Sequence, residues 1–373
     1  MFKGRANPEA ARAVLERKGL HPDQRRMFCG IPVSSLAVGT YLGPMDEATD
    51  HKVTLACLKA IELGVNFIDT AINYRGQRAE RTVGEAFRRG LSAGAFKREE
   101  IFVSTKCGFV PYEGAPTRDI GALFEQQYVA KGIARKSDLI AGCHCMEPAY
   151  LRDQIERSRK NLQLETIDLL YVHNPETQLE ELPARIFYDK LEKAFEALEG
   201  EVRDGKIAAY GMATWDAFRD EETAQTHVSL EKCVEVALRA AKKAGSREPH
   251  FKAVQLPLNL AMPEAALMAT QEIAGEKIPA IEAAKKLGLS VALSVPLFQS
   301  RLCHGLPDFI VDAFPKDYSQ AHCALAFATS FSAVDCAMLG MKQLEHVEHN
   351  LRFLKFPRLA PATLNKVIEA IVR

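Results

Sequence analysis

Eight short runs of β-forming residues recur along the chain, and a stretch with helical periodicity follows each of them. Two of these stretches, HKVTLACLKAIELG (51–64) and YLRDQIERSRKNLQL (150–164), bring an apolar residue back every three or four positions. Strands that alternate with helices favour parallel β-α units, and eight such units favour closure into a barrel. The sequence therefore predicts an α/β fold, a (β/α)8 TIM barrel. The predicted strands are LAVGTYLG (36–43), NFIDTA (66–71), IFVSTK (101–106), IDLLYVHN (167–174), IAAYGMAT (207–214), AVQLPL (253–258), SVALSVP (290–296) and DCAMLG (335–340).

Residues 1–33 precede the first predicted unit and form an N-terminal extension. Within this part of the chain, ANPEAARAVLERKG (6–19) has a helical pattern, and RMFCGIPVSS (26–35) fits a small hairpin under the barrel floor. We predict that the extension packs against the barrel of residues 34–373 and takes no part in its chemistry.

A long loop, residues 107–146, separates the third predicted strand from its helix. Loops between a strand and the next helix usually have about 2–6 residues, and much longer ones are often functional. The run GALFEQQYVAKG (121–132) indicates short helices within the loop. We expect the loop to lie over the barrel mouth, where it would shape a substrate pocket together with Trp215 and RLCHGLPDF (301–309).

The composition is that of a globular protein with one large core. Hydrophobic residues make up 47% of the 373 residues and charged residues 26%. Acidic and basic residues balance at 48 each and form no long basic run, which argues against nucleic acid and favours a small-molecule partner. The first twenty residues are charged throughout, and no stretch approaches the roughly 20 apolar residues of a membrane span. We therefore expect no membrane partner and a cytoplasmic protein.

Nine scattered cysteines in mostly apolar surroundings indicate reduced, buried thiols. The cluster Cys143-His144-Cys145 invites a metal interpretation, but it lacks a second paired-ligand motif at zinc spacing. His346 and His349 lie three residues apart on a predicted helix and could present two ligands, although a solvated helix face is the commoner arrangement. We predict no metal site.

Four ionisable residues lie where predicted strands end. Asp69, Lys106 and His173 close the second, third and fourth strands, and Tyr74 follows the second strand in its loop. Because the strands of a parallel barrel all point the same way, these side chains converge on one rim, the face that carries barrel active sites. Taken alone, Asp69 could merely cap the next helix and Tyr74 could be an ordinary aromatic. The convergence of all four favours a catalytic group.

The chemistry of the four residues is complementary. A phenol has a pKa of about 10 in water and is a poor proton donor at neutral pH, but a nearby ammonium stabilises the phenolate and brings that pKa towards the working range. Lys106 can supply the ammonium, and Asp69 can keep a partly buried lysine charged. His173 can donate a hydrogen bond that orients a carbonyl oxygen. The set is suited to delivering a proton to a developing oxyanion.

Four segments resemble the signatures of the aldo-keto reductases, in order and at compatible spacing. They are GVNFIDTAINYRGQRAERTVGEAF (64–87), IFVSTK (101–106), IDLLYVHNPE (167–176) and GMKQLEHVEHN (340–350), and the resemblance covers roughly residues 34 to 355. It implies a (β/α)8 barrel that uses NADPH to reduce an aldehyde or ketone to an alcohol. It also places the family's catalytic tetrad on Asp69, Tyr74, Lys106 and His173, with Tyr74 as the general acid.

The resemblance further implies where the cofactor binds. The chain has no G-x-G-x-x-G turn of the Rossmann type, which this family does not use. Gln255 matches the residue that hydrogen-bonds the nicotinamide carboxamide, and Ala213-Thr214 stands where the family often has Ser-Asn. After strand seven, Leu293 and Ser294 replace a stacking Tyr. The implied cofactor-binding residues are Thr214, Gln255, Ser294, Leu297, Gly340, Lys342, His346 and Asn350, with Lys342 as the 2′-phosphate contact.

Two other functions remain open from the sequence. A barrel that binds nicotinamide nucleotide as a sensor or regulatory subunit, with slow or vestigial reductase activity, would carry the same motifs. A metal-dependent hydrolase would need ligands at several strand ends, where only His173 and Asp69 qualify. The intact tetrad favours the reductase, acting on a small-molecule carbonyl substrate.

Overall fold

Eight parallel strands close into a single barrel in the computed structural model, which describes residues 1–114, 117 and 119–372. Going round the barrel, the order is β11-β12-β3-β4-β5-β6-β7-β8, and β8 pairs with β11 to close it. All eight predicted strands are confirmed, with small differences at their ends. The strands are β3 (Leu36–Gly39), β4 (Phe67–Asp69), β5 (Phe102–Cys107), β6 (Leu169–His173), β7 (Tyr210–Ala213), β8 (Phe251–Pro257), β11 (Ser290–Ser294) and β12 (Cys336–Gly340).

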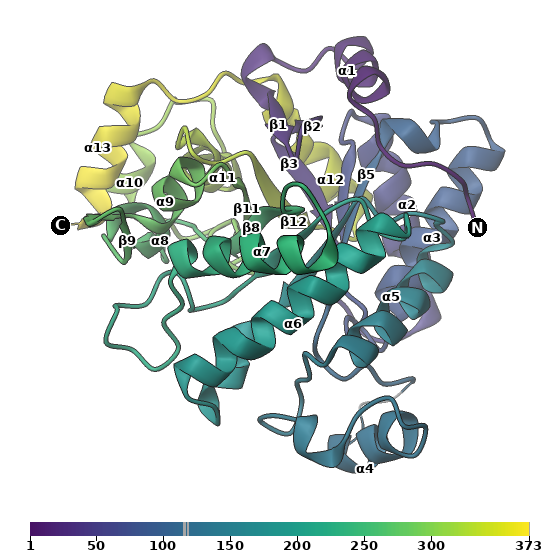
Figure 1. The fold of residues 1–373 in the computed structure, drawn as a ribbon. Coiled ribbons are helices and arrows are strands. Elements are labelled where there is room, and N and C mark those ends of the chain that lie inside the picture. Colours follow the sequence, from purple (N-terminus) through teal and green to yellow (C-terminus); the bar gives the residue numbers. More distant parts are fainter. Residues whose placement is uncertain (115–116, 118, 373) are drawn as a thin grey trace.

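One principal helix follows each barrel strand and covers its outer face (Figure 1). The predicted (β/α)8 TIM barrel is therefore confirmed. Apolar side chains of the helices pack against outward-facing residues of the strands in one large core. These helices are α2 (Glu47–Glu62), α3 (Arg78–Ser92), α5 (Pro148–Leu162), α6 (Ala184–Arg203), α7 (Leu230–Ala244), α9 (Ala280–Lys286), α11 (Gln320–Ser330) and α12 (Leu344–Leu351).

Side chains along each barrel strand alternate between the interior and the surrounding helices. In β5, Val103 lies in the outer core, and the Thr105 hydroxyl donates to the Glu80 carboxylate of α3 at 2.7 Å. Ser104 and Lys106 have the opposite parity and point inward. The same parity turns Asp69, His173, Gln255 and Ser294 toward the interior, so the polar ends of different strands meet inside the mouth.

The N-terminal segment closes the other end of the barrel. Helix α1 (Pro8–Arg17) is capped by the Asn7 side chain, which accepts a hydrogen bond from Ala10 N at 2.8 Å. Strands β1 (Arg25–Phe28) and β2 (Ile31–Ser34) form an antiparallel hairpin. The Phe28 ring of the hairpin lies 5.1 Å from Phe67 and 5.6 Å from Phe102, both inside the barrel. The hairpin thus seals the floor; the division of the chain after residue 33 stays a prediction.

The 107–146 loop contains helical structure and is part of the core. It holds α4 (Ile120–Phe124), a π-helical turn η3 (Glu125–Val129) and a 3-10 turn η4 (Lys136–Asp138), while positions 115, 116 and 118 lie outside the described residues. Phe124 and Tyr128 are fully buried, and their rings lie 5.8 and 4.6 Å from the Tyr150 ring of α5. In Figure 1 this segment lies at the end of the molecule opposite the β1–β2 hairpin.

Several further elements were not predicted. A second hairpin, β9 with β10, precedes α9, and α13 follows the last barrel unit. Within the described part of the chain, no helix is both long enough and apolar enough to cross a membrane. The remaining elements are η1 (Pro22–Gln24), η2 (Arg98–Glu100), η5 (Pro175–Glu180), α8 (Glu264–Leu267), β9 (Gln271–Ile273), β10 (Glu276–Ile278), α10 (Asp308–Val311), η6 (Arg352–Lys355) and α13 (Pro361–Val372).

Candidate active site

A cavity of about 410 Å³ opens at the carboxyl ends of the strands. Asp69, Tyr74 and His173 line it, and Lys106 lies beneath them with 1% of its surface exposed. The structure therefore brings the four residues expected to be catalytic to one place, as the common direction of the strands requires. The aromatic side chains of Tyr41, Phe109 and Trp215 also line the cavity.

The base of the site is a buried ion pair between Lys106 and Asp69. Lys106 Nζ donates to Asp69 Oδ2 at 2.5 Å and to the Thr70 carbonyl oxygen at 2.9 Å. The second carboxylate oxygen, Asp69 Oδ1, accepts from the Ser104 hydroxyl at 2.6 Å. Burial lowers the pKa of Lys106, but the adjacent Asp69 carboxylate and Tyr74 more than offset this, so that the pKa is raised overall. Lys106 is therefore an ammonium at neutral pH.

Tyr74 lies above this pair. Lys106 Nζ is 4.8 Å from the centroid of the Tyr74 ring, and the His173 ring meets Tyr74 edge to face at 5.6 Å. Burial raises the pKa of Tyr74, and the Lys106 charge lowers it by less. The expected lowering of the pKa of Tyr74 is therefore wrong: desolvation outweighs the Lys106 charge, and Tyr74 holds its proton at neutral pH.

His173 is held neutral. Burial lowers the pKa of His173 well below 6.5, and the nearby Lys106 charge adds to this effect. Its backbone carbonyl accepts a hydrogen bond from Nε2 of His144 at 2.8 Å, and the Phe109 ring lies edge-on to both imidazoles. Nδ1 of His173 has no hydrogen-bond partner among the described residues. A neutral imidazole carries one N–H donor, which suits it to orienting an oxygen in the cavity.

Hydrogen bonds of the His144 ring hold the end of the 107–146 loop next to His173. Its Nδ1 lies 2.9 Å from the Gln178 side-chain nitrogen, so Nδ1 accepts and Nε2 carries the proton. A Cβ on Gly108, which has φ +128°, would lie 2.5 Å from Nε2 of His144, so only glycine fits beside the ring. Burial lowers the pKa of His144 to about 4.

Five of the residues expected to bind a cofactor line the same cavity: Thr214, Gln255, Ser294, Leu297 and Gly340. Gln255 Nε2 and Ser294 Oγ are buried and find no hydrogen-bond partner within the described part of the chain. A buried donor without a partner carries a desolvation cost, which a ligand with matching polar groups removes. Leu293 is fully buried in the outer core because its parity on β11 is opposite to that of Ser294.

The other three expected contacts follow the last barrel strand. Of the described residues, the cavity lining reaches Gly340 and leaves out Lys342, His346 and Asn350. Lys342 precedes α12, with its Nζ about 4.0 Å from where a Cβ on Gly43 would stand. His346 is exposed on α12, and Asn350 is buried there. The binding role of these residues stays a prediction.

Some residues of the site were not anticipated from the sequence. Ser104 lies two positions before Lys106, and the two-residue period of a strand could have predicted its inward side chain. His144 and Phe109 come from the long loop, where no periodicity indicates the direction of a side chain.

Cys143 and Cys145 flank His144, whose two ring nitrogens are both hydrogen-bonded to other residues. Within residues 1–114, 117 and 119–372, no group of three His, Cys, Asp or Glu side chains could hold a metal ion.

Comparison with known proteins shows which family this chain belongs to. The sequence model of the aldo/keto reductase family matches residues 35–239, more than half of the chain. The chain belongs to the aldo/keto reductase family.

Individual members of the family are distant from this chain. Aldo-keto reductase family 1 member C13 of Mus musculus is 27% identical over 143 residues, 38% of this chain and 32% of that protein. A Schizosaccharomyces pombe protein named as a candidate voltage-gated potassium channel subunit beta is 25% identical over 61% of this chain and 55% of its own length. The matches thus span about a third to a half of these relatives.

Among solved structures, an aldo/keto reductase from Klebsiella pneumoniae in complex with NADP and acetate superimposes with a TM-score of 0.63. The match covers 94% of this chain and 95% of that one at 20% sequence identity. At such identity the likeness establishes the barrel fold.

The buried His144 makes stability depend on pH in a predictable direction. Below about pH 6.5 the unfolded chain protonates this imidazole, whereas the folded chain does so only near pH 4. The stabilisation is complete above pH 6.5 and is lost as the pH falls. Relative to His144→Gln, the parent should lose about 2 kcal/mol of unfolding free energy between pH 7 and pH 5.

Chemical denaturation of both proteins at the two pH values measures this difference. The comparison is needed because burial raises the pKa of Glu176 to about 7, and this carboxyl group stabilises the folded state as the pH falls through the same window. Glu176 is unchanged in the variant, so its contribution cancels. Parallel pH dependences would show that His144 is protonated equally in both states.

Proposed function

We propose that this protein is an NADPH-dependent oxidoreductase that reduces the carbonyl group of a small aldehyde or ketone to an alcohol. The observation that carries the proposal is the Lys106–Asp69 ion pair buried directly beneath Tyr74, at the base of the cavity. Burying two charges is costly, and a structural role would be served as well by apolar residues. A protonated phenol held over an ammonium has the chemistry of a general acid.

The residues around the cavity fit a nicotinamide nucleotide. Gln255 Nε2 and Ser294 Oγ are buried polar atoms facing the cavity, and they suit the oxygen and nitrogen of a carboxamide. Thr214 offers a hydroxyl beside Gln255, with its Oγ1 3.5 Å from the Gln255 carbonyl oxygen. Gly340, Lys342, His346 and Asn350 would hold the adenosine 2′-phosphate end. When bound, NADPH supplies the hydride for the carbonyl carbon.

Each member of the tetrad then has a defined task. Tyr74 donates the proton from Oη to the carbonyl oxygen as negative charge develops there. Lys106 stabilises the phenolate that this step leaves, and Asp69 keeps Lys106 charged and in place. Neutral His173 donates a hydrogen bond that orients the carbonyl oxygen. The walls formed by Tyr41, Phe109 and Trp215 favour substrates with an apolar or aromatic body.

A second candidate is a nicotinamide-nucleotide-binding sensor or regulatory barrel with slow reductase chemistry. Two observations favour it: the Schizosaccharomyces pombe relative is named as a channel subunit, and Ala213-Thr214 replaces a Ser-Asn pair common in the family. The intact tetrad favours the enzyme. Measured turnover of a panel of aldehydes and ketones distinguishes the two, since a sensor would bind NADPH and turn over none of them at a useful rate.

Tyr74→Phe should bind NADPH nearly as well as the parent and lose most carbonyl reduction. The substitution removes the proton donor and leaves the ring, so the loss in kcat should be about 10² to 10⁴, the usual contribution of general acid catalysis. Fluorescence titration measures NADPH binding, and steady-state kinetics measures kcat. Reduction of a good substrate within about threefold of the parent would exclude Tyr74 as the acid.

Lys342→Met should weaken NADPH binding by roughly one to two orders of magnitude and leave NADH binding nearly unchanged. The 2′-phosphate is the only difference between the cofactors, and a charge-assisted contact contributes about 1.5–3 kcal/mol. Titrating both cofactors at low and high salt tests this, because salt should weaken NADPH binding to the parent more than to the variant. Lys193→Met, on the exposed face of α6, is the matched control. Equal losses for both cofactors would move the phosphate contact to another cation.

A further inference from the structure

The turn between Tyr74 and α3 has an unusual backbone. Arg75, Gly76 and Gln77 are consecutive and all left-handed, with φ of 51°, 60° and 66°. Two of the three are not glycine, and such residues adopt this conformation only where surrounding contacts hold them. Because Tyr74 immediately precedes the turn, those contacts also decide where its phenol lies.

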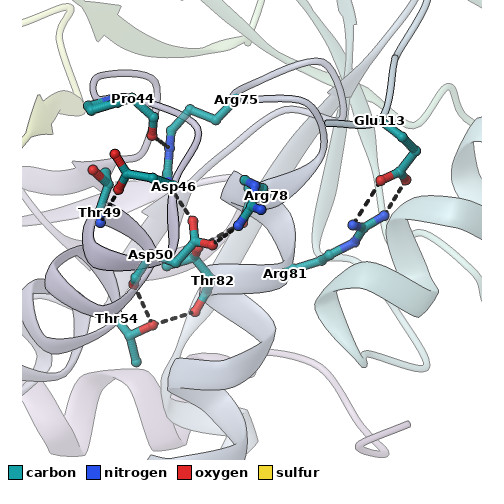
Figure 2. Close-up of polar contacts among 10 residues, drawn as sticks. All are labelled: Pro44, Asp46, Thr49, Asp50, Thr54, Arg75, Arg78, Arg81, Thr82 and Glu113. Carbon is teal, nitrogen blue, oxygen red and sulfur yellow. Dashed lines mark hydrogen bonds and ion pairs between the residues drawn. The ribbon is translucent and has the colours of Figure 1, made fainter. Parts of the chain in front are cut away.

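Arg75 holds the turn on one side. Its side chain is buried, with 4% of the residue exposed. Its Nη2 pairs with Asp50 Oδ1 on α2, and its Nε donates to the Pro44 carbonyl oxygen at 3.1 Å (Figure 2). Arg78 Nη1 engages the other oxygen, Asp50 Oδ2, at 2.5 Å. The contacts tie the turn to α2 and to the segment after β3.

Gln77 holds the turn on the other side. Its Nε2 donates to Glu113 Oε1 at 2.7 Å and to the Tyr112 carbonyl oxygen at 3.3 Å, both in the 107–146 loop. Glu113 is fixed in turn by Arg81 of α3, as Figure 2 shows. A Cβ on Gly76 would lie 3.1 Å from the Gly114 carbonyl oxygen, so the loop packs closely against the turn.

The Arg75 contacts also connect Tyr74 to the cavity rim. Pro44 belongs to the same short segment as Tyr41 and Leu42, which line the cavity. The Tyr41 ring meets the Tyr74 ring edge to face at 5.0 Å. One buried guanidinium therefore fixes the backbone on both sides of this aromatic contact.

We propose that Arg75, paired with Asp50, is a positioning residue that holds Tyr74 in the geometry for proton transfer. The inference rests on the proposed reductase function. Arg75 acts through the turn and takes no part in the chemistry itself. A displacement of about 1 Å at a reacting group can cost roughly 10²-fold in rate. The loss should appear in kcat, because the residues expected to hold the cofactor are on other strands.

The test compares Arg75→Met and Arg75→Lys with the parent. Arg75→Met should lower kcat about 30- to 100-fold and change the Kd for NADPH less than about threefold. Arg75→Lys keeps the charge beside Asp50 and should recover about half of that loss on a logarithmic scale. Arg88→Met is the matched control: it removes an exposed arginine that pairs with Glu85 on the same helix, and it should leave kcat unchanged.

Hydrogen exchange provides a readout that needs no substrate. The amides of Tyr74, Arg78 and Ala79 bond within the turn, to the carbonyl oxygens of Ala71, Arg75 and Tyr74. Exchange in a peptide spanning residues 72–80 should become at least about tenfold faster in Arg75→Met while β5 and α6 keep parental rates. If Arg75→Met does not fold, the same measurement on Arg75→Lys should show a smaller increase confined to this peptide.

The outcomes separate the positioning role from the proposed function. A parent that reduces no carbonyl contradicts the reductase function, and the exchange data still decide whether Arg75 holds the turn. Parental kcat with parental exchange in Arg75→Met would overturn the positioning role. Faster exchange across the whole protein, with kcat per folded molecule unchanged, would also overturn the positioning role. Arg75 would then contribute only to the global stability of the protein.

Discussion

The buried pair of Lys106 and Asp69 is the interaction on which the site depends. An ammonium inside a barrel would lose its proton without a carboxylate partner. Asp69 therefore keeps Lys106 charged. The Ser104 hydroxyl also donates a hydrogen bond to Asp69, and the Thr70 carbonyl oxygen accepts one from Lys106. The retained positive charge acts on Tyr74 above it and lowers the pKa of His173 beside it.

The barrel and its loops contribute in different ways. Strand parity and a common strand direction place Asp69, Lys106 and His173, which need no loop to reach the mouth. Tyr74 is on a turn, and its position depends on side chains from α2 and from the 107–146 loop. The same loop backs His173 through His144. The long loop thus helps to position the residues of the site, and its Phe109 side chain also lines the cavity.

The features that could be predicted from the sequence are those that depend on residues close together in the chain. Alternating strands and helices indicated the barrel, and a polar residue at the end of each buried strand indicated Asp69, Lys106 and His173. Contacts between segments far apart in the chain were beyond such rules: Arg75 with Asp50, and His144 with the carbonyl of His173. The expectation that Lys106 brings the pKa of Tyr74 down towards neutrality was wrong: the Lys106 charge lowers this pKa, but burial raises it by more, and burial depends on packing, which no local pattern reveals.

The pH dependence of kcat for carbonyl reduction, at saturating NADPH and substrate, tests the central claim most directly. This profile reports the ionisation of groups in the bound complex. With the pKa of Tyr74 raised above 10.0 and that of His173 well below 6.5, kcat should be level between about pH 6.5 and 9. A kcat that falls as the pH rises through about 6.5, the ordinary pKa of histidine, would contradict the account. The proton would then come from an imidazolium at His173, and the ion pair beneath Tyr74 would need another explanation.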